Sequence, residues 1–505
     1  MAKKLIELGV AKDEIHKTVL GIEIDPVEAA MTRTNLAKIG ITHTDKIVRT
    51  GEFFEYCKLN LMHKTRFRAV VGNPPFLRYH DFPKKIKDTA FELMSDAGLK
   101  PVGHTNSWVP FLVVSSLLLS EDGLLAMVVP AQLFQVSYAS ETRRFLSSYY
   151  KKLTIITFEK LVFEGILQEV VVLLGERNNS ENEGIRVVEY KDTSDLKLNG
   201  AKTHEIWNDK NKLKPLDHTK DKWTQYFLDI DEILLLKKLR EKFQLRTCKE
   251  IMDVDIGVVT GRNDYFVLTD DAVKEKELVP QSTRIVCNSS QLRGTMFSAT
   301  DLSGIKNQSP SWLFTPPDSS VLEFPEAVQR YIKYGETIDV PDGYKCRIRK
   351  KWYVIPSTWV PDAFLLRQVH EYPKIILNET NATCTDTIHR VRLVCKNKGR
   401  EVVSAFLNSL TFAFSEILGR SYGGGVLTLE PSEVEQLPLP LEGLENLDFE
   451  KIDHLERQNK IENILDMTDS TLLKEGLRIN NKEVAMLRNI WRKLKNRRLS
   501  RNSSS

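Results

Sequence analysis

The sequence predicts an α/β protein with a parallel sheet, followed by a β-rich second domain and a helical tail. Residues 1–175 alternate short apolar runs with amphipathic stretches, which is typical of parallel strands joined by helices. From residue 250 to 440 the chain changes to short β-rich runs separated by Gly, Pro and Asn. Helical spacing returns over 445–499. We therefore expect domains at 1–240, 241–440 and 441–505.

In the first domain, the expected strands are short apolar runs that end in a turn or at a helix start. They cover, in chain order, 17–25, 46–54, 67–73, 123–130 and 169–176. A helix is expected over 26–40, because Asp25 suits the N-cap and Pro26 suits the first helical position. A second helix is expected over the apolar stretch 107–120.

The connection to the second domain is predicted as loops from residue 190, followed by a helix over 231–243. The second domain itself is expected to be β-rich. Its strands are expected within 255–268, 351–357, 374–379 and 389–395. A helix over 402–418 follows them.

Composition limits the class of protein. The chain has 505 residues, of which 41% are hydrophobic, so it can bury a large core in two or three domains. Its longest apolar run, 108–119, is too short to span a bilayer, and the N-terminus lacks the apolar core of a signal peptide. We therefore expect a cytoplasmic protein without a membrane partner. The 6 cysteines lack a CxxC pair, which indicates free thiols, and no histidine spacing suggests a metal site.

The stretch 68–76, RAVVGNPPF, places two consecutive prolines directly after a buried strand. Proline fixes its own φ angle, restricts the residue before it and has no N–H to donate. The chain is therefore stiff at this corner and continues as neither helix nor strand. The side-chain amide of Asn73 and the carbonyl of Pro74 are left free to face a ligand, beside the ring of Phe76.

Polar side chains follow three of the expected strands at the point where each strand ends. Glu23 and Asp25 suit the two hydroxyls of a ribose, since carboxylates accept hydrogen bonds. Glu52 and Phe53 suit the amine and the face of an adenine. Asn73 follows the third strand, and ligands of open parallel sheets bind at this edge. The alternative for each acid is a helix N-cap.

These residues resemble the S-adenosylmethionine-dependent DNA adenine-N6 methyltransferases of restriction–modification systems, in the gamma order that places the catalytic domain first. The family's Asn-Pro-Pro-Tyr/Phe tetrapeptide stands here as Asn73-Pro74-Pro75-Phe76. Its motif GxEIDP stands at 21–26 and contains Glu23 and Ile24, and its motif GDF stands as Gly51-Glu52-Phe53. In the second half of the chain, the segments 255–268, 344–356 and 422–440 resemble a TaqI-type specificity domain.

The resemblance implies a Rossmann-like methyltransferase sheet and methyl transfer to N6 of an adenine flipped out of double-stranded DNA. The Asn73 side-chain oxygen and the Pro74 carbonyl would accept the two amine hydrogens, which concentrates the lone pair on nitrogen. Phe76 would stack on the flipped base, and Phe163 looks like the family's second aromatic residue beside it. The cofactor S-adenosyl-L-methionine would lie against Glu23, Ile24, Glu52 and Phe53.

One departure from the family concerns the cofactor loop. In the family, a first strand and a Gly-rich loop precede a helix like AKKLIELG, which here stands at residues 2–9. The first strand is then missing from the expected sheet, which leaves a gap between its neighbours. Two interpretations stay open: the natural start lies upstream of Met1, or the chain is a truncated, weakly active or inactive DNA-binding remnant. Glu52, where the family usually has Asp, is a smaller departure.

The second domain carries a basic run that suits DNA. The basic residues between 345 and 351 are Lys345, Arg347, Arg349, Lys350 and Lys351. They precede Trp352, which suits phosphate contacts beside an aromatic anchor. Arg262 lies in a predicted turn within reach of a phosphate or a base edge, and Gly423–Gly425 suits a backbone nest for phosphate. The alternative for the basic run is a solvated strand edge protected by charge.

The C-terminal stretch 488–501 contains 7 basic residues, with Ile490, Trp491 and Leu494 between them, and no acidic residue. It is either a DNA clamp or a frayed helix end with solvated charges, and the sequence favours neither.

Other functions compete with DNA modification. A fused restriction enzyme needs an Asp followed by Glu-x-Lys on one strand, and the nearest match, Asp362 with Glu371 and Lys374, has the wrong spacing. We therefore expect a separate cognate restriction endonuclease and a monomer that binds double-stranded DNA. Methylation of RNA or protein is disfavoured by the long specificity-like domain.

Overall fold

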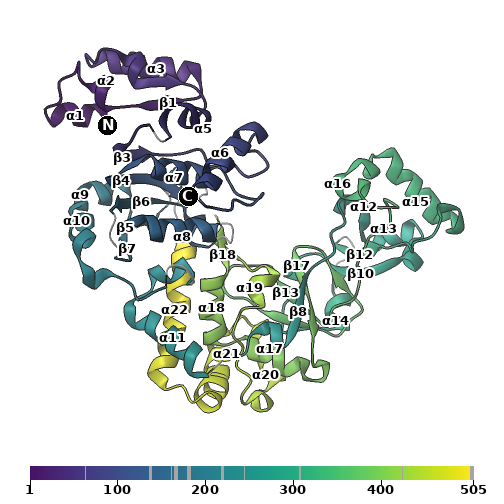
Figure 1. Cartoon of the computed structure of the whole chain (residues 1–505). Coiled ribbons are helices and arrows are strands. Elements are labelled where there is room, and N and C mark those ends of the chain that lie inside the picture. Colours follow the sequence, from purple (N-terminus) through teal and green to yellow (C-terminus); the bar gives the residue numbers. More distant parts are fainter. Residues whose placement is uncertain are drawn as a thin grey trace. The chain divides into compact units, whose positions relative to one another are not determined.

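A computed structural model describes the whole chain except residues 63, 136–138, 161, 164–168, 179–182, 218–220, 244, 306–308, 423–424 and 501–505. The chain divides into two compact units, Met1–Trp223 and Thr224–Ser505, whose elements are labelled in Figure 1. The division lies before α11 (Ile230–Phe243), so this helix belongs to the second unit. The C-terminal stretch also belongs to the second unit and is not a separate body.

The first unit contains every strand expected from the sequence, with shorter bounds for the first three and a longer β4. Its strands are β1 (Gly21–Glu23), β2 (Val48–Thr50), β3 (Phe67–Gly72), β4 (Leu119–Pro130), β5 (Tyr150–Phe158), β6 (Val170–Arg177) and β7 (Ile185–Tyr190). Its α-helices are α1 (Ala2–Glu7), α2 (Ile15–Thr18), α3 (Pro26–Lys38), α4 (Thr44–Ile47), α5 (Phe53–Tyr56), α6 (Lys84–Asp96), α7 (Trp108–Leu117), α8 (Ser140–Tyr149), α9 (Thr193–Asn199) and α10 (Ala201–Asn208).

Several of these elements were not predicted. Strands β5 and β7 were missed, and helices α9 and α10 replace part of the loops expected from residue 190. Asp192 explains the start of α9, because its side chain accepts hydrogen bonds from the backbone N–H groups of Ser194 and Asp195.

The strands of the first unit form two separate sheets. Strands β1 and β2 pair in parallel, whereas the larger sheet has the order β3-β4-β6-β5-β7. Strand β6 runs antiparallel to both β4 and β5. The larger sheet is therefore mixed, and the prediction of a parallel sheet was wrong for β6. The reason is that the connection from β5 to β6 is too short for the crossover that parallel strands need.

Strands β1 and β3 are both edge strands, and within the described chain neither pairs on its second side. Ile22 of β1 and Phe67 of β3 nevertheless pack against the same buried cluster, which includes Val114 of α7. On β3, the Val71 side chain is 55% exposed. The two sheets therefore share one buried cluster, although no ladder joins them within the described chain.

The second unit combines three small sheets with helices. Its strands are β8 (Met252–Ile256), β9 (Val267–Thr269), β10 (Ser282–Val286), β11 (Met296–Phe297), β12 (Pro310–Phe314), β13 (Ala363–Leu366), β14 (Gln368–Val369), β15 (Ile375–Asn378), β16 (Thr383–Cys384), β17 (Ile388–Leu393), β18 (Arg420–Tyr422) and β19 (Val426–Thr428). Besides α11, its α-helices are α12 (Asn263–Phe266), α13 (Asp270–Glu275), α14 (Ala299–Ser303), α15 (Glu326–Thr337), α16 (Tyr344–Arg347), α17 (Gly399–Phe406), α18 (Ser409–Leu418), α19 (Pro431–Val434), α20 (Phe449–Arg457), α21 (Ile461–Thr468) and α22 (Asn481–Leu499).

Two expectations for the second unit were wrong. The segment 351–357 is an irregular turn and not a strand, so the basic run before it is not a strand edge. The helix expected over 402–418 is two helices, α17 and α18, because the Asn408 side chain caps α18 by accepting a hydrogen bond from the Thr411 N–H. No single helix in the described residues is long and apolar enough to cross a membrane, although α17 and α18 reach that length together across a 79° bend.

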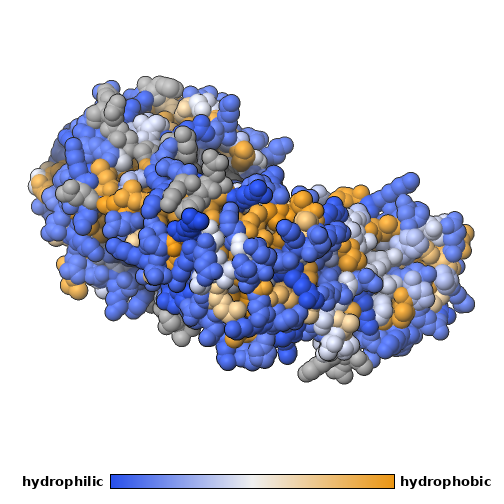
Figure 2. All heavy atoms as spheres, turned by 90° about the horizontal axis from the view of Figure 1, so that it is seen from below, coloured by the Kyte–Doolittle hydropathy of each residue, from blue (hydrophilic) through white to orange (hydrophobic). Residues whose placement is uncertain are grey.

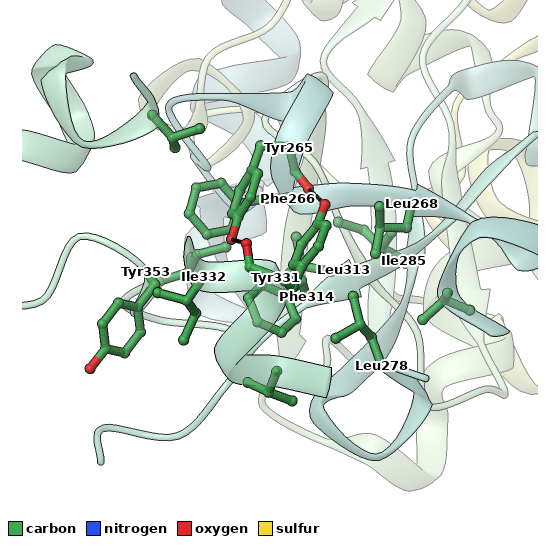
Figure 3. Close-up of a cluster of buried hydrophobic side chains, with 14 of the residues drawn as sticks. Tyr265, Phe266, Leu268, Leu278, Ile285, Leu313, Phe314, Tyr331, Ile332 and Tyr353 are labelled. Atoms are coloured by element: carbon green, nitrogen blue, oxygen red, sulfur yellow. Dashed lines mark hydrogen bonds between the residues drawn. The ribbon is translucent and has the colours of Figure 1, made fainter. Parts of the chain in front are cut away.

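Residues 258–355 form a lobe with its own buried core, which we call the 258–355 lobe (Figure 3). Tyr265 and Tyr331 stack at its centre with ring centroids 4.7 Å apart. Each tyrosine hydroxyl donates to the backbone carbonyl of the other residue, at 3.0 and 2.7 Å. The two segments that carry these rings, α12 and α15, are therefore joined by stacking and by two reciprocal hydrogen bonds.

The basic C-terminal stretch forms most of helix α22, which packs against α18. Its cations are used inside the second unit: Arg488 bonds Asp469 at 2.8 Å, and Lys493 bonds Asp229 at 2.7 Å. Arg498 is buried with Glu416 at 2.7 Å. Of the two open interpretations of this stretch, the frayed helix end is wrong, because α22 continues to Leu499, and the DNA clamp stays a prediction.

Replacing Tyr331 by phenylalanine is expected to destabilise the 258–355 lobe. The substitution keeps the ring stack but removes the hydrogen bond to the buried Tyr265 carbonyl, which costs about 1–3 kcal/mol. Urea denaturation followed by tryptophan fluorescence measures the loss, since Trp352 packs 5.4 Å from the Tyr265 ring. The control is Tyr334→Phe on the same helix, where the side chain is 50% exposed. Equal midpoints for the two variants would contradict the assigned role of the Tyr331 hydroxyl.

Candidate active site

The tetrapeptide Asn73-Pro74-Pro75-Phe76 follows β3 directly, as the sequence predicted. Asn73 is exposed, Pro74 is buried and Phe76 is half-buried. Within the described residues, no hydrogen bond is formed by the Asn73 side chain or by the Pro74 carbonyl. The two polar groups are therefore available to a ligand.

The loop that carries the tetrapeptide is held by the start of α7. The buried hydroxyl of Ser107 donates to the Pro75 carbonyl at 2.5 Å and accepts a hydrogen bond from the Leu77 N–H at 2.9 Å. The Asn106 side-chain oxygen accepts from the Tyr79 N–H at 2.9 Å. The segment after the prolines is thereby fixed by side chains that precede α7, while β3 holds the residues before Asn73.

The acids at the ends of β1 and β2 are brought to one edge of the small sheet. Glu23 pairs with Thr50 in the parallel ladder, and the Gly51 N–H donates to the Glu23 carbonyl at 2.8 Å. The Glu23 carboxylate accepts from the Asp25 N–H at 2.9 Å. Glu52 follows Gly51 and so lies next to this edge. Ile24, which lies between Glu23 and Asp25, is 61% exposed.

The alternative role for these acids, that of a helix N-cap, is partly correct. Asp25 is the N-cap of α3, since it accepts from the Val27 N–H at 2.7 Å. Glu52 is the N-cap of α5 and accepts from the Glu55 N–H at 2.7 Å through one carboxylate oxygen. A carboxylate has four acceptor positions on two oxygens, so capping leaves Glu52 able to bind a further donor.

Helix α7 links the two halves of the candidate site. The Phe53 ring stacks on Phe111 of α7 with centroids 4.9 Å apart. Ser107, which holds the tetrapeptide loop, lies one helical turn before Phe111, about 6 Å along the axis. Close to the same place, burial first and the Glu52 carboxylate second raise the pKa of Cys57 to about 12, so this thiol is no nucleophile at neutral pH.

Phe163 is half-buried and lies in the connection between β5 and β6. In the ladder, Pro130 at the end of β4 pairs with Val170 at the start of β6. Strand β6 therefore starts at the edge where β3 and β4 end. Residues 161 and 164–168 around Phe163 lie outside the described chain, and no contact joins Phe163 to Phe76 within the described residues.

The basic residues predicted to bind DNA fall into two groups. Arg262, Arg349 and Lys351 already bind protein groups. Arg262 bonds Asp264 at 2.8 Å and Lys351 bonds Asp318 at 2.7 Å, while Arg349 donates to backbone carbonyls. Lys345, Arg347 and Lys350 are exposed and form no ion pair with a described carboxylate. Of the Gly423–Gly425 nest, the first two residues lie outside the described chain.

Sequence reasoning missed Ser107, Asn106 and Phe111, which touch the predicted site residues without belonging to a motif. Ser107 carries a weak signal: it stands where a helix N-cap is expected, yet its hydroxyl makes no cap bond and binds the loop. Phe111 lies inside an apolar helix and gives no signal at all.

Two family models match most of the chain. The model described as the Eco57I restriction-modification methylase matches residues 14–163. The model described as the C-terminal domain of the Type II methyltransferase M.Eco57I matches residues 220–473, which is half of the chain. The first match contains the tetrapeptide and both acidic sites, and the second contains the 258–355 lobe.

Individual proteins point the same way. The Type II methyltransferase M.AccI from Acinetobacter calcoaceticus is 22% identical over 394 residues, which are 74% of this chain and 69% of that protein. The Type II methyltransferase M.XamI from Xanthomonas campestris pv. amaranthicola is 21% identical over 455 residues, which are 85% of this chain and 77% of that protein. Among solved structures, the Type IIL restriction-modification enzyme MmeI in complex with DNA is similar in fold, with a TM-score of 0.58 and 10% identity. That match covers 95% of this chain and 66% of the MmeI chain, slightly less than two thirds.

Replacing Ser107 by alanine is expected to loosen the tetrapeptide loop. The variant removes both hydrogen bonds to the loop, each about 1 kcal/mol, so the Leu77 amide should exchange with deuterium about 10-fold faster. Hydrogen–deuterium exchange of a peptide covering 74–80 measures this. The control is Ser95→Ala, whose hydroxyl bonds only the Phe91 carbonyl of its own helix. Unchanged exchange in Ser107→Ala would show that the loop is held by other contacts.

Proposed function

Because the chain belongs to the Eco57I-type restriction–modification methylases, we propose that it transfers a methyl group to N6 of adenine in double-stranded DNA. The observation that carries the proposal is the pair of free acceptors at Asn73 and Pro74, held at the end of β3 by Ser107. Family membership supports DNA methylation within a restriction–modification system. The choice of adenine N6 rests on the Asn-Pro-Pro-Phe tetrapeptide.

The two acceptors suit an exocyclic amine. The lone pair of such an amine is delocalised into the base, so the site must favour a more tetrahedral nitrogen. The Asn73 side-chain oxygen accepts one amine hydrogen and the Pro74 carbonyl accepts the other, which directs the lone pair away from the ring. When bound, S-adenosylmethionine supplies an electrophilic methyl group: the N–C bond forms as the S–C bond breaks, sulfur keeps that electron pair, and an amine proton passes to water.

Two aromatic rings support a base that has left the duplex. Phe76 follows the acceptors in the tetrapeptide, and Phe163 lies in the connection between β5 and β6. A base flipped into this site stacks on Phe76, with Phe163 as the second face of the slot. Pro75 keeps the chain stiff between the acceptors and the ring, since its φ angle is fixed.

The residues at the edge of the small sheet fit the nucleoside part of S-adenosylmethionine. Glu23 accepts from the ribose hydroxyls, because its carboxylate has acceptor positions beyond the one used by the Asp25 N–H. Glu52 accepts from the adenine amine in the same way, and the Phe53 ring, supported by Phe111, covers the face of the adenine. Ile24 adds an apolar contact.

The second unit is the proposed DNA-reading part. Lys345, Arg347 and Lys350 are exposed cations without a described ion pair, and they suit a phosphate backbone. Arg262, Arg349 and Lys351 already bond protein groups, so DNA would be a second partner for them. The proposed partners are double-stranded DNA and a separate endonuclease with the same recognition sequence. We place the enzyme in the cytoplasm as a monomer.

The split between the two sheets favours a second candidate function. The acidic edge lies on β1 and β2, the acceptors follow β3, and within the described chain β1 and β3 are not paired with each other. A pocket built across that split is held by side-chain packing and not by a strand ladder, which favours a chain that binds DNA but S-adenosylmethionine only weakly. Calorimetric titration with S-adenosylmethionine separates the two functions: micromolar binding supports the enzyme, and no binding supports the DNA-binding chain.

Replacing Asn73 by alanine is expected to reduce methyl transfer by about 100-fold or more, because one of two transition-state acceptors is lost. The measurement uses tritiated S-adenosylmethionine and unmethylated phage DNA, and mass spectrometry of the nucleosides identifies N6-methyladenine. Binding of cofactor and DNA should stay at the wild-type level. The control is Asn446→Ala, an exposed asparagine in the second unit. Methylcytosine as the product, or full activity in Asn73→Ala, would contradict the proposal.

A further inference from the structure

Helix α16 and the turn after it are fixed to the loop at 259–262. Arg349 donates to the carbonyls of Val259 and Thr260 at 2.9 and 2.7 Å. The Cys346 side chain is fully buried beneath α16. Desolvation lowers the pKa of Arg349, which is consistent with a guanidinium that serves the protein interior and not the solvent. The basic run is therefore a rigid part of the fold.

Gly261 allows this close contact. Its φ angle is +85°, and a Cβ atom at this position would lie 2.7 Å from the Lys345 Cβ. Only glycine combines this backbone conformation with such an approach. The loop and α16 thus form one body, which we call the α16 platform and define as residues 259–262 and 344–350.

The outer surface of the α16 platform combines apolar and cationic side chains. Tyr344 is 65% exposed and Ile348 is 61% exposed. Lys345, Arg347 and Lys350 alternate with them in sequence, and none forms an ion pair with a described carboxylate. A cavity of 460 Å³ opens beside Ile348 and is lined also by Lys345 and Lys350.

Charge and composition together identify the occupant. Hydrophobic residues are interspersed with hydrophilic ones over the visible surface of the chain, so one exposed apolar side chain means little (Figure 2). The α16 platform differs, because Tyr344 and Ile348 stand among three solvated cations that form no ion pair with a described carboxylate. Asp318, which also lines the cavity, already pairs with Lys351. Such a surface attracts an anion. Duplex DNA offers both surfaces: phosphates for the cations and a groove lined by sugars and base edges for the apolar side chains.

We propose that the α16 platform docks on duplex DNA with a division of roles. Lys345, Arg347 and Lys350 bind phosphates, while Tyr344 and Ile348 enter a groove and contact sugars and bases. Arg349 is a positioning residue that fixes the platform through the 259–260 carbonyls. This inference rests on the proposed function, which requires that the chain bind duplex DNA.

The two roles leave different signatures in salt titrations. Each phosphate contact contributes about 0.9 to the slope of log K against log salt, whereas an apolar contact contributes nothing to it. Each of Lys345→Gln, Arg347→Gln and Lys350→Gln should therefore lower the slope by about 0.9. The double variant Tyr344→Ser with Ile348→Ser should weaken binding about 10-fold at every salt concentration, with the slope unchanged.

The experiment measures fluorescence anisotropy of a labelled, unmethylated plasmid fragment with the full chain. Matched controls are Leu322→Ser, which is 85% exposed in the same lobe, and Lys474→Gln, an exposed lysine elsewhere in the second unit. Both controls should bind like the wild type. Circular dichroism melting of every variant separates lost binding from lost folding.

Arg349 is tested by two variants. Arg349→Gln should weaken binding without changing the salt slope, because no phosphate contact is lost. Arg349→Lys keeps a donor for the two carbonyls and should restore most of the affinity. A slope lowered by about 0.9 in Arg349→Gln but unchanged in Arg349→Lys would instead make Arg349 a phosphate contact and overturn its positioning role.

The possible failures are distinguishable. If the wild-type chain binds no duplex, the proposed function itself fails. If the wild type binds duplex and the Tyr344 and Ile348 double variant binds equally well, only the docking proposal is overturned. If the variants lose affinity for single-stranded DNA but bind the duplex like the wild type, the platform binds a different nucleic acid. That result would also overturn the docking proposal.

Discussion

Helix α7 is the constraint on which the candidate active site depends, because it touches both halves of the site. Its first residues hold the loop after β3 through Ser107, and its second turn supports Phe53 through Phe111. The helix is apolar on almost all sides and buried, so it cannot shift without breaking core contacts. The geometry of the candidate site therefore depends on the packing of α7 with its neighbours and not on a continuous sheet.

The split sheet makes this dependence unusual. In a continuous parallel sheet, backbone ladders fix the strand ends relative to each other, and helices only cover the faces. Here the ladder is interrupted between β1 and β3 in the described chain, and side-chain packing in the shared cluster replaces it. Hydrogen bonds of a ladder fix the direction in which two strands can move, whereas apolar packing has no such directional preference. The separation between the acids on the small sheet and the acceptors after β3 is consequently set by side-chain packing and not by backbone pairing.

Much of the site was predictable because its residues directly follow strands. The positions of Glu23, Glu52 and Asn73 could be read from apolar runs that end in polar or proline-rich corners, and family resemblance then suggested their roles. Ser107 was not predictable, since a serine before an apolar helix is normally its cap and nothing local indicates a loop far away in sequence. The fold shows the same contrast. Strand β5 begins with lysines and was missed, because burial by neighbouring strands overrides local polarity.

The basic residues show why a charge run alone does not identify a binding surface. Arg349 and Lys350 are indistinguishable as members of the charge run in the sequence. In the structure, Arg349 donates to backbone carbonyls, whereas Lys350 forms no ion pair with a described carboxylate. The C-terminal stretch is an extreme case, because Arg488, Lys493 and Arg498 are each matched by carboxylates from other helices. A cation already neutralised by a protein carboxylate gains little from a phosphate, since the first pair must be broken. The chain's modest excess of basic residues thus acts where pairing is incomplete, which in the second unit includes the exposed face of α16.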